Sequence, residues 1–188
     1  MAYPTRVNPR RTYEALEIEE RAYSLLAGAG PIVAPVNPLV IAGARGITVL
    51  QGEFKAEDIV GIVEWEGSVR KVAVNAKLSE LTKRYVIAHA IGHYTLHATE
   101  PKGAIVEDGE NVLRPIEREF SPVSKENAPT ERMEYEARLF TVALLMPKQL
   151  LMQVHHASGS PREASQKLQV PEEALEYRLR YLSSTSKW

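Results

Sequence analysis

Two histidines four residues apart, His89 and His93, set the strongest condition on how this chain can fold. They lie in the apolar segment 83–97, which Ser79 can cap as a helix. On a helix the two imidazoles stand one turn apart on the same face, so both can bind one zinc ion. Gly92 between them costs a helix about 1 kcal/mol relative to Ala, which predicts close packing by a neighbouring element.

The residue after the first histidine is Ala90. In the H-E-x-x-H pattern of zinc peptidases, this position holds a glutamate that takes a proton from the metal-bound water. A methyl group cannot do so, and the chain therefore keeps the ligand pair and lacks the base. His97 continues the series but lies ~12 Å along the axis from His89, too far to share one ion. We expect His97 to be a surface residue or to support a ligand from behind.

A third metal ligand must come from another element. The chain has no cysteine, so its metal ligands are limited to His, Asp and Glu. The helix predicted over residues 131–145 offers Glu134 and Glu136, which point to different sides of that helix. Glu134 is preferred because Ala137, three residues on, allows the two helices to approach closely. A histidine pair can occur by chance and a helical glutamate is usually solvated, so the prediction depends on finding them together.

Composition and length indicate an ordinary soluble protein. The 188 residues, 44% hydrophobic and 25% charged, fit one domain with a small appendage. The net charge of -1 gives no overall attraction to nucleic acid or to an anionic membrane. No signal peptide is visible, and the most apolar stretch, residues 140–146, is too short to cross a bilayer. We therefore expect a cytoplasmic protein without membrane association.

The remaining sequence predicts a mixture of helices and strands. A strand is expected near residues 47–50, and β-branched residues predict a hairpin over 58–75. Residues 99–129 are broken by prolines and glycines and read as a long surface excursion with a short strand near 104–106. Helices are expected over residues 13–26, 131–145, 148–156, 162–168 and 172–182.

Several separate segments together resemble the ImmA/IrrE family of metallopeptidases. Residues 83–97 are similar to the family's motif helix, with Ala90 in place of its glutamate. Residues 134–147 read E-x-E-A-R-x-F-x-x-x-L-L-M-P and resemble the family's second helix, with Arg138 where the family favours Asn. Residues 164–182 resemble the family's C-terminal helices.

The resemblance implies an α+β fold. A zincin-like metallopeptidase domain would occupy residues 13–156, with a small sheet packed on the motif helix. Residues 157–188 would form a helix-turn-helix-like extension. The resemblance also implies Zn²⁺ as the cofactor, held by His89, His93 and Glu134, with Ala90 at the position of the missing catalytic base. Glu136 stays open as the alternative third ligand.

The function implied by the resemblance is that of a zinc-dependent endopeptidase. Its substrate would be a helix-turn-helix (Xre-type) transcriptional repressor in a stress-response, mobile-element or toxin–antitoxin-like pair. With Ala90 the chain is expected to be inactive, through an introduced substitution or as a natural pseudo-peptidase that binds a regulator without cleaving it. A further alternative is a DNA-binding regulator that uses the C-terminal helices. Residues 148–188 hold six basic and four acidic residues, so nucleic acid is the less favoured partner.

Overall fold

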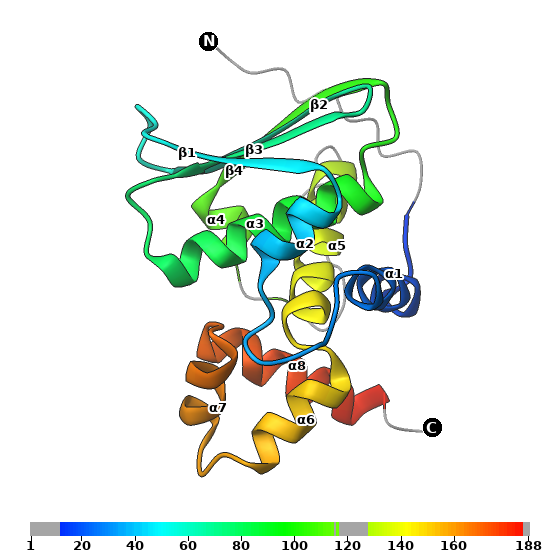
Figure 1. Cartoon of the computed structure of the whole chain (residues 1–188), viewed down its shortest axis with the longest axis vertical. Coiled ribbons are helices and arrows are strands. Elements are labelled where there is room, and N and C mark those ends of the chain that lie inside the picture. The colour runs from blue at the N-terminus through cyan, green and yellow to red at the C-terminus, as the bar shows by residue number, and fades with distance from the viewer. Residues whose placement is uncertain (1–11, 115, 117–127, 186–188) are drawn as a thin grey trace.

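The computed structural model describes residues 12–114, 116 and 128–185, and it places a sheet on one side of a group of helices (Figure 1). Within these residues the sheet has four strands in the order β1-β3-β2-β4. β1 runs parallel to β3, whereas β2 is antiparallel to both β3 and β4, and β4 is therefore an edge strand. The strands are β1 (Ile47–Gly52), β2 (Ile59–Glu66), β3 (Val69–Asn75) and β4 (Lys102–Asp108).

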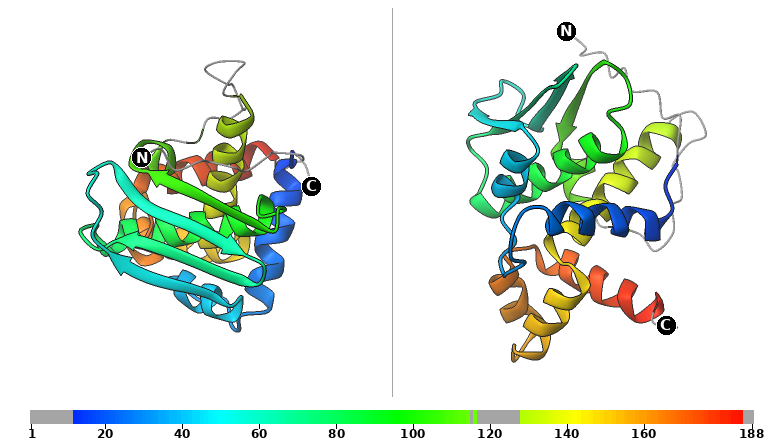
Figure 2. Two further views of the ribbon diagram at one scale, coloured as in Figure 1. Left: turned by 90° about the horizontal axis from the view of Figure 1, so that it is seen from above. Right: turned by 45° about the vertical axis from the view of Figure 1, so that its right-hand side comes forward.

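Two long helices, α3 (Glu80–Leu96) and α5 (Ala128–Leu145), lie under the sheet, as the view from above shows (Figure 2). Ser79 caps α3 as predicted, since its side chain accepts a hydrogen bond from the backbone N–H of Thr82. The mixed architecture confirms the predicted α+β fold class. The other helices are α1 (Ala15–Ala27), α2 (Pro38–Ala44), α4 (Gly109–Leu113), α6 (Lys148–His156), α7 (Pro161–Leu168) and α8 (Glu172–Thr185).

The strand predictions were only partly right. The hairpin over residues 58–75 is confirmed as β2 and β3, joined at Gly67 with a positive φ of 57°. The short strand predicted at 104–106 is in fact the seven-residue strand β4, because its backbone pairs along β2 from Ile59 to Glu66. The short helices α2 and α4 were not predicted. The predicted surface excursion falls partly on residues 115 and 117–127, which lie outside the described residues.

Glycines bring the central helix close to both of its neighbours. A Cβ atom added at Gly61 of β2 would lie 3.0 Å from Cγ1 of Val86 on α3. A Cβ atom at Gly92 would lie 3.1 Å from Cδ1 of Phe140 and 3.4 Å from the Cα of Ala137 on α5. The close packing predicted from Gly92 is therefore confirmed, and α5 is the element that approaches.

The C-terminal helices α6, α7 and α8 gather at the end of the molecule away from the sheet (Figure 1). Arg178 of α8 is buried, and its guanidinium contacts the carbonyl oxygen of Met146 and the carboxylate of Glu19 on α1. The division into residues 13–156 and 157–188 stays a prediction. No helix among the described residues is long and apolar enough to cross a membrane.

Candidate metal centre

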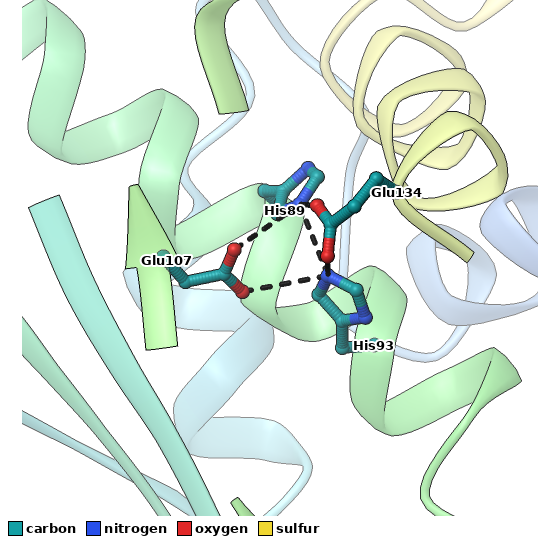
Figure 3. Close-up of side chains that lie close together, drawn as sticks. All are labelled: His89, His93, Glu107 and Glu134. Atoms are coloured by element: carbon teal, nitrogen blue, oxygen red, sulfur yellow. Dashed lines mark hydrogen bonds and ion pairs between the residues drawn. The ribbon is translucent and has the colours of Figure 1, made fainter. Parts of the chain in front are cut away.

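The histidine pair is fully buried on α3. His89 and His93 each expose 0% of their surface, and their Nε2 atoms lie 3.0 Å apart. Both rings point away from the α3 axis toward the space between β4 and α5 (Figure 3). The one-turn spacing thus places the two ring nitrogens where one ion could contact both.

Glu134 reaches the same point from α5. Its Oε2 lies 3.1 Å from Nε2 of His89, and its Oε1 lies 3.6 Å from Nε2 of His93. The close contact between Gly92 and Ala137 brings the two helices near enough for this arrangement. The structure therefore brings together the three residues that the sequence predicted as ligands.

Glu107 of β4 is a fourth member of the cluster that the sequence analysis missed. Its Oε2 lies 3.4 Å from Nε2 of His89, and its Oε1 lies 3.4 Å from Nε2 of His93. Figure 3 shows it on the opposite side of the two rings from Glu134. Ile105 and Glu107, two residues apart, are both buried on one face of β4. The alternation of buried residues along a strand could have identified Glu107 from the sequence. It could do so only if the predicted strand had extended as far as Glu107.

The two carboxylates of the cluster favour a positive charge between them and the two imidazoles. Ligand atoms of His89, His93, Glu107 and Glu134 all lie within 4.8 Å of one another. Burial lowers the pKa of His89, but the carboxylates of Glu107 and Glu134 outweigh it and raise that pKa to about 9. Burial opposes ionisation of Glu134, yet the nearby imidazoles hold its pKa well below the usual range.

The donor set fits zinc. Neither oxygen of Glu107 has a hydrogen-bond partner among the described residues, although the side chain is only 1% exposed. A buried carboxylate needs a cation to compensate it: protonated His89, 3.4 Å away, can do so in the metal-free chain, and a bound metal ion can take over that role. Two imidazoles with carboxylates form a common zinc-binding set.

A second buried network supports His93 from behind. Nδ1 of His93 lies 3.1 Å from Nδ1 of His97, and Nε2 of His97 lies 3.1 Å from Oε2 of Glu136. Arg132 and the backbone N–H of Tyr13 also donate to Glu136. His97 is 4% exposed, so it is a supporting residue and not a surface residue. Glu136 contacts His97 and not the histidine pair.

This network fixes which nitrogen of His93 faces the cluster. Burial opposes ionisation of Glu136, but hydrogen bonds from His97 and Arg132 lower its pKa, so it is a carboxylate that accepts from Nε2–H of His97. Burial lowers the pKa of His97, which is therefore neutral and accepts at Nδ1 from Nδ1–H of His93. The lone pair at Nε2 of His93 is then free to bind a metal.

Two positions depart from the resemblance noted in the sequence. Ala90 is fully buried on α3 and brings no polar atom to the site. Arg138 is buried on α5 and donates from Nη1 to the carbonyl oxygen of Asn111, 2.8 Å away. Asn111 belongs to α4, which directly follows β4. Arg138 thus ties α5 to the segment that carries Glu107.

A helix with the H-x-x-x-H spacing, packed under a small mixed sheet and facing a glutamate on a second helix, defines a zincin-like metallopeptidase fold. A family model described as the IrrE N-terminal-like domain, peptidase family M78, matches residues 42–180. The chain belongs to this family of metallopeptidases, and the predicted ImmA/IrrE resemblance is confirmed. A search of curated proteins gives no match.

Proposed function

We propose that His89, His93 and Glu134 bind one zinc ion, and that the chain recognises a helix-turn-helix (Xre-type) repressor as its protein partner. The observation that carries this proposal is the convergence of three buried ligand side chains from α3 and α5 on one point. Zinc in such a site would supply Lewis acidity toward a peptide carbonyl if one coordination position is open. His97 and Glu136 keep the His93 ring in the orientation that binds.

The proposal includes that this chain leaves its partner uncleaved. Ala90 cannot accept a proton, and general-base assistance is typically worth about 10²–10⁴-fold in rate. The chain would then act as a regulator that binds the repressor, whether the change at Ala90 is natural or introduced. A place in a stress-response, mobile-element or toxin–antitoxin-like pair belongs to the same proposal.

The edge of the sheet supports a peptide ligand. Among the described strands, β4 pairs with β2 on one side, and it carries Glu107 next to the cluster. The unpaired backbone of an edge strand can add an extended peptide as a further strand. A segment bound along β4 would pass beside the histidine pair.

The test is incubation of the zinc-loaded chain with a candidate repressor. The chain as it stands should bind the repressor in a pull-down and leave it intact on a gel. Ala90→Glu should bind equally well, and once the zinc has a position open to water it should gain cleavage that a zinc chelator abolishes. Chelator-sensitive cleavage by the Ala90 chain at a rate similar to that of the variant would contradict the role of position 90. Failure of both chains to bind any repressor would contradict the partner.

A further inference from the structure

Glu107 is the one member of the buried cluster that the proposed function leaves without a role. It reaches the site from β4, on the side of the histidine pair opposite Glu134 (Figure 3). Its carboxylate is 1% exposed, and neither oxygen has a hydrogen-bond partner among the described residues. The polar contacts of this carboxylate are with Nε2 of His89 and Nε2 of His93.

The spacing of the ligand atoms identifies the role. Four ligands bound tetrahedrally at the usual zinc distances stand about 3.3 Å from one another. Glu107 oxygens lie 3.4 Å from each Nε2 of the pair. The corresponding Glu134 distances are 3.1 and 3.6 Å. Glu107 thus stands at the same distance from the histidines as the proposed third ligand does.

A carboxylate that works through a metal-bound water would stand further out. It needs a hydrogen bond of about 2.6–3.2 Å to that water in addition to the bond between water and metal. With one oxygen 3.4 Å from Nε2 of His89 and the other 3.4 Å from Nε2 of His93, Glu107 has the spacing of a direct ligand and not of a group one water further out. The geometry therefore argues for direct ligation and against a relocated catalytic base.

We propose that Glu107 is the fourth protein ligand of the metal and closes the coordination sphere as His₂Glu₂. This inference rests on the metal site of the proposed function, and it adds that no position is left for water. Ala90→Glu should therefore cleave only when Glu107→Gln opens a position beside it. Closed four-ligand sites are typical of structural zinc, whereas catalytic sites keep one position open. In this chain the ion would connect three elements, α3, α5 and β4.

The first test is zinc affinity, measured by competition with a chromogenic chelator at neutral pH. Glu107→Gln keeps the shape of the side chain and removes its charge, and it should weaken zinc binding by about 100-fold or more. Glu110→Gln is the matched control, because Glu110 is an exposed glutamate only three residues along the chain. An affinity of Glu107→Gln within about 3-fold of the control would overturn the assignment of Glu107.

The second test is the coordination number, read from the visible spectrum after loading with Co²⁺. The unsubstituted chain should give the intense absorption of a four-coordinate ion, and azide should not change it. Glu107→Gln should have an open position and should respond to azide. A response of the unsubstituted chain to azide would show that the site is not closed.

If His93→Ala and the unsubstituted chain both bind no zinc, the proposed metal site itself fails. Thermal unfolding of the metal-free forms checks that each variant folds.

Discussion

At the scale of single residues, the two glutamates of α5 have separate tasks. Glu134 faces the histidine pair, whereas Glu136 is two residues along and faces His97. Both could not face the same point, because neighbours two apart lie on different sides of a helix. Both glutamates were candidate ligands in the sequence. Which of them faces the histidine pair depends on how α5 is rotated about its axis relative to α3.

The first prediction compares Glu134→Gln with Glu136→Gln. Loss of a direct ligand should weaken zinc binding by more than about 100-fold, whereas loss of a residue that orients a ligand costs about 10-fold to 100-fold. Zinc affinity from chelator competition makes the comparison, and both variants keep the size of the side chain. A larger loss of zinc affinity for Glu136→Gln than for Glu134→Gln would identify Glu136 as the third ligand.

The second prediction concerns the pH dependence of the metal-free protein. The pKa of His89 rises from its ordinary 6.5 to about 9 in the folded chain. Its contribution to stability is therefore fully present below about pH 6.5 and is lost as the pH rises through 9. The melting temperature of chelator-treated protein should fall by several degrees between pH 6.5 and 9.

Zinc provides the control for this pH effect. With the metal bound, the charge that compensates Glu107 and Glu134 no longer depends on a proton at His89, so the decline over the same pH range should be much smaller. His89→Gln should flatten the decline of the metal-free protein as well. An equal decline with and without zinc would show that groups outside the cluster cause it.

At the scale of elements, β4 shows what sequence alone could and could not establish. The helices that carry His89 and Glu134 were predictable because apolar spacing and an N-cap are local signals. β4 is flanked by prolines and glycines, and it forms through pairing with β2, some forty residues earlier in the chain. Such long-range pairing has no local signature, and for this reason Glu107 was read as part of a loop.

The third prediction tests how β4 is held in position. A Cβ atom at Gly103 would lie 2.2 Å from Cζ2 of Trp65, whose indole also donates a hydrogen bond to the carbonyl oxygen of Glu100. Gly103→Ala must displace this ring, and we expect a loss of about 1–3 kcal/mol in the free energy of unfolding. Urea unfolding followed by tryptophan fluorescence measures it. Zinc affinity should fall too, because β4 carries Glu107.

Gly43→Ala is the matched control for this substitution. Gly43 lies in α2, and a Cβ atom there meets no other atom within 4 Å. Alanine favours the helix over glycine, so the control should be neutral or more stable by about 0.4–1 kcal/mol. If Gly103→Ala had the same free energy of unfolding as Gly43→Ala, contact with the ring of Trp65 would not hold β4 in position.

At the scale of the whole molecule, the C-terminal helices pack against the rest of the chain. Leu168, Val170, Leu175 and Leu182 are buried, as expected for helices that pack on a neighbouring core. Arg178, one of two neighbouring arginines that could have contacted DNA phosphates, is 2% exposed and contacts Glu19 and Met146. Arg180 is exposed and pairs with Glu176. Of these two arginines, therefore, only Arg180 faces the solvent.

The last prediction uses these two arginines as a matched pair. Arg178→Met keeps most of the aliphatic volume but removes charged hydrogen bonds that join α8 to α1 and to the end of α5, and it should cost about 2–3 kcal/mol. Arg180→Met loses an exposed pair and should change stability by less than about 0.5 kcal/mol. Urea unfolding followed by tryptophan fluorescence measures both, in a Trp188→Phe background where Trp65 is the one remaining tryptophan. Trp65 lies in the sheet, far from α8 in the sequence, so its transition reports the substitution only if both parts unfold together.

A lower midpoint for Arg178→Met with one sharp transition would therefore show one cooperative unit over the described chain. An unchanged Trp65 transition would instead support a separately folding extension, and would make duplex DNA binding by that extension worth measuring at low and high salt.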